Sequence, residues 1–375
     1  MFVKNNQISG RQTARLLFFD LLGYSALLIP TALAQTAGID GIFSIGIGIV
    51  AGFFYLRMLK IVCSQMKGSY GQALIETCGN TLGNGIKVGY LLYFLLLAGR
   101  VAAVFAELVV KELLEKQFEL VLFFILLLTY YGVSGGIEGR ARVYEILFWI
   151  ILIPLFLMML LALPGVDTDY WLPVLTENPV GILKGAYRVF LCVSILFLVP
   201  FFSEYISGKG QVYHCAKRAL AWTGLVLGAL YLILLGMFGA EALATMDYPV
   251  VTMMSRIQMT GGFLKRADAL MFGVWFFTLY ALMNSLVFFS GRLWNFNQKT
   301  EKLWIIFAVM VVYLLANGFY HSDSLKQLFE KFFLYVGTPF VVLVPMLLGG
   351  SFSMKGNIFG EENKESEDKE KEDGE

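Results

Sequence analysis

Charged side chains are scarce in this sequence: lysine, arginine, aspartate and glutamate make up 15% of its 375 residues, and there are two histidines. A typical soluble domain is about 25% charged and about 45–50% apolar. Here 58% of the residues are hydrophobic and 33 are phenylalanine, more than the core of one water-soluble domain can bury. This composition excludes an ordinary cytosolic enzyme and predicts a protein that crosses a membrane several times.

Cysteine is also scarce, and catalytic motifs are missing. The four cysteines have no paired spacing, so we expect neither disulfides nor a zinc site. The sequence contains no Walker motif, no glycine-rich phosphate loop and no HExxH. His214 and His321 lie at loop edges, so neither is placed for proton relay. We therefore predict no enzyme activity, no catalytic residues, no metal ligands and no cofactor.

Long apolar runs are what the sequence has instead. A helix that crosses a bilayer needs about 20 mostly apolar residues, whereas barrel strands are about 9–11 residues long and alternate in character. The runs therefore predict an all-α membrane protein with one transmembrane domain over residues 1–350. Its ten expected transmembrane helices are 11–37, 41–62, 86–112, 119–135, 141–163, 181–206, 214–240, 268–292, 303–319 and 332–350.

The distribution of basic residues predicts the orientation. With the N-terminus inside, the inner side carries fifteen Lys and Arg residues before the C-terminal tail, and the outer side carries eight. We therefore expect a multi-pass protein with both termini inside. Residues 361–375 hold nine acidic residues and three lysines, so we expect 351–375 to be a disordered acidic cytoplasmic tail. The first fifteen residues do not resemble a removable signal peptide.

The ten helices divide into two halves of five, about 11–163 and 181–350. Because five is odd, the second half must enter the membrane in the opposite direction, which gives an inverted repeat. Such folds place the ligand site near the midplane, where the first helix of each half is interrupted. Gly23 and Pro30 predict a break in helix one, and Pro200 predicts a break in helix six. The alternative is that glycine and proline are simply frequent in membrane helices.

One charge near the centre of a helix requires a partner. Arg100 on helix three costs at least about 2.5–3.5 kcal/mol on insertion scales, so it must face the interior. One hypothesis is that Arg100 binds a ligand carboxylate or a phosphate-like anion. The other is a structural pair between Arg100 and Asp20 on helix one. Asn284, at mid-depth on helix eight, either joins two helices or lines the site, because a buried amide must be hydrogen-bonded.

Three stretches together resemble the spore germination permeases, the B subunits of nutrient germinant receptors. The stretch from Gly132 to Glu145 (GVSGGIEGRARVYE) resembles the family's G-x-E-x-x-A-R-x-x-E entry to helix five. The segment from Tyr248 through Trp275 is similar to the family's outer segment before helix eight. The opening ISGRQ, with Leu28-Ile-Pro30 and Ala37-Gly38, also fits. The similarity covers about residues 8–350 and depends on the order and spacing of these pieces.

The resemblance implies a LeuT-like five-plus-five inverted repeat with helices one and six broken. It also implies a ligand pocket between helices one, three, six and eight, in which unwound backbone at 23–25 would donate to a ligand carboxylate. The expected ligand-binding residues are Gly23, Tyr24, Ser25, Leu97, Arg100, Leu198, Pro200, Ser203 and Asn284. The implied partners are a nutrient such as an amino acid, A and C receptor subunits and membrane lipid, but no nucleic acid, in the inner spore membrane.

Two functions are compatible with these features. The first is a receptor subunit that binds a small nutrient and triggers spore germination by changing conformation. The second is a secondary transporter that moves an amino acid together with a sodium ion or a proton. One scaffold can serve either function, and a channel opened by a ligand or a partner is compatible with the first.

Overall fold

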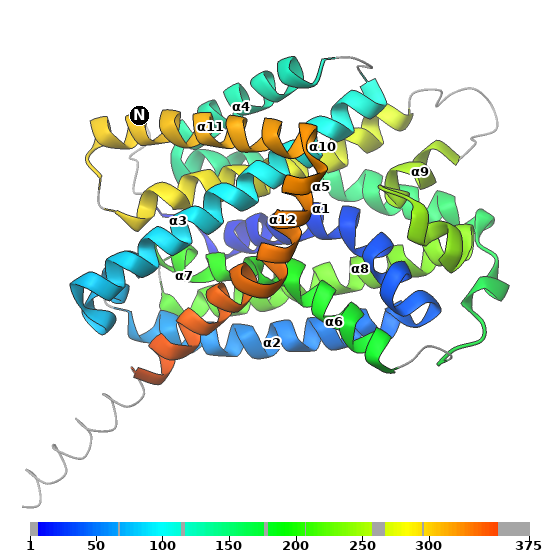
Figure 1. Ribbon diagram of the computed structural model, residues 1–375, viewed down its shortest axis with the longest axis horizontal. Coiled ribbons are helices and arrows are strands. Elements are labelled where there is room, and N and C mark those ends of the chain that lie inside the picture. The colour runs from blue at the N-terminus through cyan, green and yellow to red at the C-terminus, as the bar shows by residue number, and fades with distance from the viewer. Residues whose placement is uncertain are drawn as a thin grey trace, which may run out of the picture.

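The computed structural model describes residues 7–66, 68–113, 117–175, 179–206, 208–256, 267–294 and 296–351. Figure 1 shows a helical bundle in which most helices run close to the long axis of the molecule. The acidic tail lies, from residue 352 onward, outside the described residues. The α-helices are α1 (Gly10–Ala37), α2 (Gly41–Gln65), α3 (Tyr70–Leu113), α4 (Phe118–Ser134), α5 (Gly136–Ala162), α6 (Pro179–Val193), α7 (Val199–Phe202), α8 (Lys209–Thr245), α9 (Pro249–Arg256), α10 (Ala267–Ser290), α11 (Gln298–His321) and α12 (Asp323–Phe332).

The apolar helices correspond to the ten expected crossings. Within the described residues, eight helical runs are long and apolar enough to span a membrane, and the first of them, Gly10–Gln65, contains both α1 and α2. The 17-residue α4 is a shorter apolar helix. α12 continues through a π-helical turn, Phe333–Gly337, into a last helical stretch that reaches Ser351. The expectation of an all-α membrane protein is confirmed.

Helix six is interrupted, as expected. α6 ends at Val193, the chain then forms a 3₁₀ turn over Ser194–Leu198, and α7 follows with Pro200 in its first turn. Proline has no N–H to donate to the preceding turn, and a 3₁₀ stretch inside a helix marks a change in its hydrogen-bonding pattern. The sequence therefore located this irregularity correctly.

The interruption expected in helix one at residues 23–25 is wrong for this structure. α1 is a continuous helix that passes through Pro30. A Cβ on Gly23 would lie 2.7 Å from the Thr278 side chain on α10, so the glycine allows two helices to pack closely rather than to unwind. The Ser25 hydroxyl donates to the Leu22 carbonyl of the same helix, at 3.1 Å. Helix one therefore offers a ligand side chains and not free backbone N–H groups at this level.

α1 lies at the centre of the bundle. Every residue from Leu16 to Leu27 is buried, and the helix packs against α6, α8 and α10. A helix buried on all sides belongs to the core of a large helical protein. Asp20 and Tyr24 are therefore held inside the protein, where their polar atoms depend on neighbouring helices.

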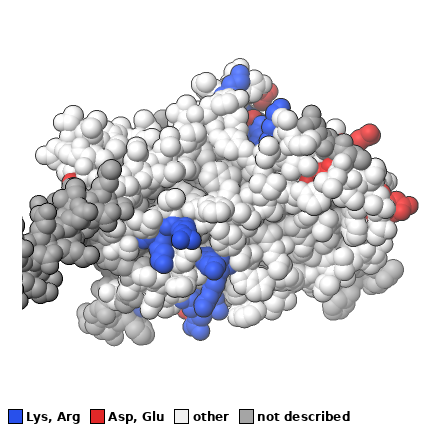
Figure 2. All heavy atoms as spheres, turned by 90° about the horizontal axis from the view of Figure 1, so that it is seen from below, with Lys and Arg blue, Asp and Glu red and all other residues white. Residues whose placement is uncertain are grey.

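The surface is mostly uncharged. Figure 2 shows a face that is largely white, with lysine and arginine near its lower middle and its upper edge and acidic residues mainly at its right. Exposed basic residues lie near the end of α2, at Arg57 and Lys60, and near the start of α8, at Lys217 and Arg218. The orientation of the termini stays a prediction.

Replacement of Gly23 tests the close packing of α1. We expect Gly23→Leu to lower the stability of the purified protein by about 1–3 kcal/mol, because overpacking forces helices apart. The matched control is Gly46→Leu on α2, where a Cβ would meet nothing within 4 Å. Thermal unfolding in detergent measures both variants. Equal melting temperatures would contradict the close α1–α10 contact.

Candidate functional site

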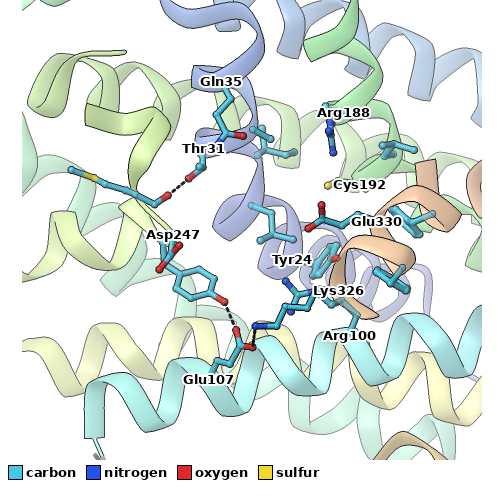
Figure 3. A pocket seen from close by; sticks show the side chains of 18 of the residues that line it. Tyr24, Thr31, Gln35, Arg100, Glu107, Arg188, Cys192, Asp247, Lys326 and Glu330 are labelled. Atoms are coloured by element: carbon cyan, nitrogen blue, oxygen red, sulfur yellow. Dashed lines mark hydrogen bonds and ion pairs between the residues drawn. The ribbon is translucent and has the colours of Figure 1, made fainter. Parts of the chain in front are cut away.

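A cavity of about 950 Å³ lies between α1, α3, α6 and α12. Residues 244–248, which lead from the end of α8 to α9, complete its wall. Figure 3 shows side chains from these elements converging on the cavity. α1 contributes one face of its outer half, including Tyr24, Leu28, Thr31 and Gln35, because residues three and four apart share a face of a helix.

Arg100 lines this cavity as a buried and unpartnered cation. Its side chain comes from α3, the residue is 9% exposed, and Figure 3 shows it beside Tyr24. Nη1 of the guanidinium is buried without a hydrogen-bond partner in the part of the chain that the structure describes. A buried charge is unfavourable unless it is paired, and an arginine is best satisfied by a carboxylate. The geometry therefore suits a ligand anion at Arg100.

Two ion pairs surround the rest of the cavity. Glu107 on α3 pairs with Lys326 on α12, at 3.4 Å, and accepts a hydrogen bond from the Tyr248 hydroxyl, at 3.0 Å. Burial, followed by the Glu107 carboxylate, raises the pKa of Tyr248, so this hydroxyl stays protonated and donates. Lys111 pairs with Asp247, at 3.2 Å. These contacts join α3, α12 and the segment before α9.

Two further charged groups line the cavity without an ion pair among the described residues. Glu330 projects from α12 and is exposed, and Arg188 projects from α6 and is half-buried. Figure 3 shows the Tyr24 side chain between those of Arg100 and Glu330. The cavity therefore presents both a cation and an anion to whatever enters it.

Most of the other residues expected at the site lie elsewhere. Only Tyr24 and Arg100 of the nine line the cavity. Asn284 donates to the Tyr280 carbonyl of its own helix, at 2.8 Å, and a Cβ on Gly132 would lie 2.7 Å from its Oδ1 atom. The remaining expected residues are packed in helices away from the cavity lining: Gly23, Ser25, Leu97, Leu198, Pro200 and Ser203.

The structural pair expected between Arg100 and Asp20 is also wrong. Asp20 accepts a hydrogen bond from Ser285 on α10, at 2.7 Å, and Ser285 accepts one from Arg140 on α5, at 2.5 Å. Asp20 and Arg140 are both buried. The cation that compensates Asp20 is therefore Arg140, which leaves Arg100 without this partner.

Apart from Arg100, none of the charged groups that line the cavity was among the expected site residues. Arg188, Lys326 and Glu330 are three of these groups. Lys326 and Glu330 are four residues apart on α12, so they share one face of that helix. This spacing could have indicated that the two residues lie on one side of the cavity. That prediction requires knowing that α12 packs against α3.

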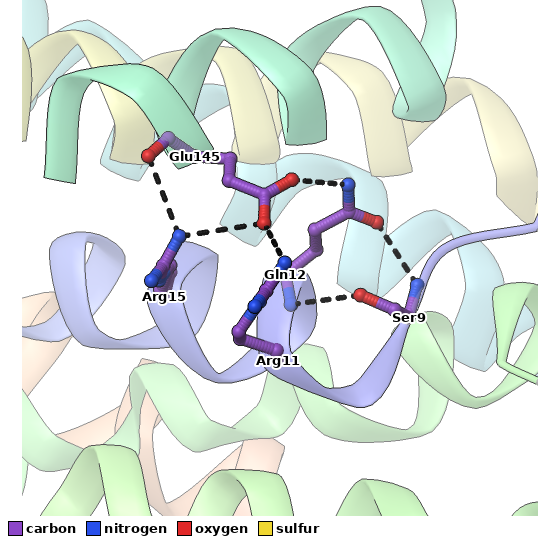
Figure 4. A network of polar contacts seen from close by, with 5 residues as sticks. All are labelled: Ser9, Arg11, Gln12, Arg15 and Glu145. Atoms are coloured by element: carbon purple, nitrogen blue, oxygen red, sulfur yellow. Dashed lines mark hydrogen bonds and ion pairs between the residues drawn. The ribbon is translucent and has the colours of Figure 1, made fainter.

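A second polar network ties the start of α1 to α5. Figure 4 shows Arg11, Gln12 and Arg15 converging on Glu145. Arg11 reaches the carboxylate at 2.5 Å, Arg15 at 3.5 Å, and the Gln12 amide donates to it at 2.9 Å. Ser9 and Gln12 form a capping box that begins the helix. The first turns of α1 are therefore held against α5 by one carboxylate.

The chain matches a known sequence family over most of its length. The profile described as "Spore germination protein" matches residues 7–324. Spore germination protein YndE of Bacillus subtilis (strain 168) is 23% identical over 331 residues, which are 84% of this chain and 88% of that protein. Spore germination protein B2 of the same organism is 23% identical over 350 residues, 89% of this chain and 90% of that protein.

A solved structure shares the fold. The substrate-bound outward-open state of a Na+-coupled sialic acid symporter superposes with a TM-score of 0.65 and 16% sequence identity. The match covers 92% of this chain and 79% of that chain. This likeness confirms the expected LeuT-like transporter fold, and at this identity it concerns the fold alone.

Removal of Glu145 tests whether it holds the start of α1. Cys215 is buried beneath this segment, and its thiol donates to the Gly10 carbonyl, at 3.0 Å. In a protein that keeps only this cysteine, we expect Glu145→Ala to raise the rate of maleimide labelling roughly fivefold, because ion pairs of this exposure contribute about 1 kcal/mol.

The matched control for this experiment is Glu138→Ala. The ion pair of Glu138 with Arg142 lies within α5, at a spacing of four residues, so its loss should leave Cys215 protected. Equal labelling rates for the two variants would contradict a role of Glu145 in holding α1.

Proposed function

The chain belongs to the spore germination protein family, and from this premise we propose that it is the membrane subunit of a germinant receptor. It binds an amino acid in the cavity between α1, α3, α6 and α12 and triggers germination through a change of conformation. Its partners are A and C receptor subunits, and it lies in the inner spore membrane with both termini inside. The observation that carries the proposal is the unpartnered guanidinium of Arg100 in the cavity wall.

The α-carboxylate of the amino acid binds Arg100. A ligand carboxylate supplies the two acceptor oxygens that a buried guanidinium needs, and such pairs are stronger than neutral hydrogen bonds. Tyr24 lies next to this position on α1 and contributes a ring and a hydroxyl. The ligand therefore replaces solvent at a group that the protein itself leaves unpaired.

The ammonium group of the amino acid binds Glu330. This carboxylate comes from α12, and in Figure 3 it lies near the same Tyr24 that lies beside Arg100. A bound zwitterion thus connects α3 with α12. Because the Glu107–Lys326 ion pair joins the same two helices, the ligand favours a conformation in which α12 is drawn onto α3. A ligand shifts a conformational equilibrium only by such differential contacts.

Transport coupled to an ion remains the second candidate, and the likeness to the fold of a symporter favours it. The environment of Asp20 argues against sodium coupling at that carboxylate. Its charge faces Arg140 through the shared Ser285 hydroxyl. Arg140 is thus the cation that offsets the charge of Asp20, which reduces the need for a sodium ion at this carboxylate.

Ligand-dependent stabilisation of the purified full chain tests the proposed function. We expect at least one of the twenty amino acids to raise the free energy of unfolding, by about 2.7 kcal/mol at a hundredfold excess over Kd. The stabilisation should be equal with and without sodium. A shift that requires sodium, or that no amino acid produces, would contradict the receptor proposal.

Arg100→Met distinguishes a ligand contact from a structural role. Removing an unpaired buried charge should leave the stability of the ligand-free protein equal or higher, while the amino-acid-dependent shift disappears. The control is Arg57→Met, an exposed residue on α2 outside the cavity. Loss of stability without ligand in Arg100→Met alone would instead mean that Arg100 holds the fold together.

A further inference from the structure

The charges around the cavity do not cancel. Four basic and three acidic side chains line it within the described residues, and two of these pairs are already formed, Lys111 with Asp247 and Lys326 with Glu107. The groups without an ion pair are Arg100, Arg188 and Glu330. The unpaired set therefore carries one net positive charge, and an amino acid with a neutral side chain uses only one of its two cations.

Arg188 is placed to contact the part of the ligand that Arg100 and Glu330 leave free. It projects from α6, one turn before Cys192, and both residues line the cavity. Figure 3 shows Cys192 below Arg188, on the side of Glu330 and Tyr24. In Figure 3, Glu330 lies between Arg188 and Arg100. A ligand with a cationic group between two anionic groups would therefore place the cation at Glu330 and one anion at each arginine.

We propose that the cavity selects an amino acid with an acidic side chain, aspartate or glutamate. The α-carboxylate binds Arg100, the ammonium group binds Glu330, and the side-chain carboxylate binds Arg188. The proposal rests on the proposed function and names the ligand class of the same site. A ligand with two carboxylates and one ammonium has a net charge of −1, which matches the unpaired charge of the lining.

The cavity selects among amino acids by the charge of the side chain and not by its size. A cavity of about 950 Å³ accommodates any of the twenty amino acids. A neutral side chain would leave the Arg188 guanidinium without an anion once the ligand displaces solvent around it, and a basic side chain would place a second cation beside it. Both cases are unfavourable because a charge that loses water must find a partner.

The test is equilibrium binding to the purified full chain of two nearly isosteric pairs, glutamate with glutamine and aspartate with asparagine, and of alanine. Of aspartate and glutamate, we expect the one that binds more tightly at pH 7 to bind at least about tenfold more tightly than its own amide. This difference is the one expected for a charge-assisted hydrogen bond. Equal affinities within both pairs, or tighter binding of the amides or of alanine, would overturn this proposal while the proposed function stands. Binding of none of the five would also overturn this proposal, and the proposed function falls with it only if none of the twenty amino acids stabilises the chain.

Substitution of Arg188 assigns the preference to one side chain. We expect Arg188→Gln to abolish the difference between acid and amide while retaining binding of the amide, and Arg188→Lys to keep part of the difference. The control is Lys184→Gln, an exposed residue one turn earlier on α6 that does not line the cavity. An unchanged preference for the acid in Arg188→Gln would overturn the assignment.

Discussion

A buried positive charge, Arg100, that has no ion-pair partner among the described residues is the constraint on which the proposed site depends. Arg100 lies inside a helical bundle whose interior is mostly apolar. Asp20, the acidic residue expected to pair with it, faces Arg140 instead. Burial of a cation without a partner lowers the stability of the folded protein. A ligand anion offsets that cost when it binds, so the same side chain that weakens the empty protein gives the bound state its stability. In the proposed function, ligand binding and conformation are therefore coupled at Arg100.

The continuity of α1 determines how the cavity recognises a ligand. Because the helix stays intact past Gly23, its backbone N–H groups are used internally, and it presents one face of side chains to the cavity. The charged contacts must then come from the surrounding helices, with Arg100 on α3, Arg188 on α6 and Glu330 on α12. In the proposed function, three separate helices contact one ligand, and their relative positions depend on its presence.

The membrane helices were well predicted from the sequence, because apolar runs long enough to span a bilayer rarely occur outside transmembrane helices. The sequence also identified Arg100, because a charge in the middle of such a run stands out, and it identified the irregular helix six at Pro200.

The sequence-based predictions failed where the role of a residue depends on a neighbour that is distant in the sequence. Gly23 is compatible with unwinding or with close packing, and only Thr278 on α10 decides between them. Arg140 was assigned to a loop because helix five was expected from residue 141, whereas α5 begins at Gly136 and buries it. The limits of the two halves, 11–163 and 181–350, stay a prediction.

The most direct measurement compares the binding of an amino acid that stabilises the protein with the binding of its α-methyl ester. The ester keeps the ammonium group and the side chain but removes the α-carboxylate charge that Arg100 requires. The account predicts that the ester binds at least about tenfold more weakly to the native chain, and that Arg100→Met binds the amino acid as weakly as it binds the ester. Equal affinity of the native chain for the amino acid and its ester would contradict the central role of Arg100.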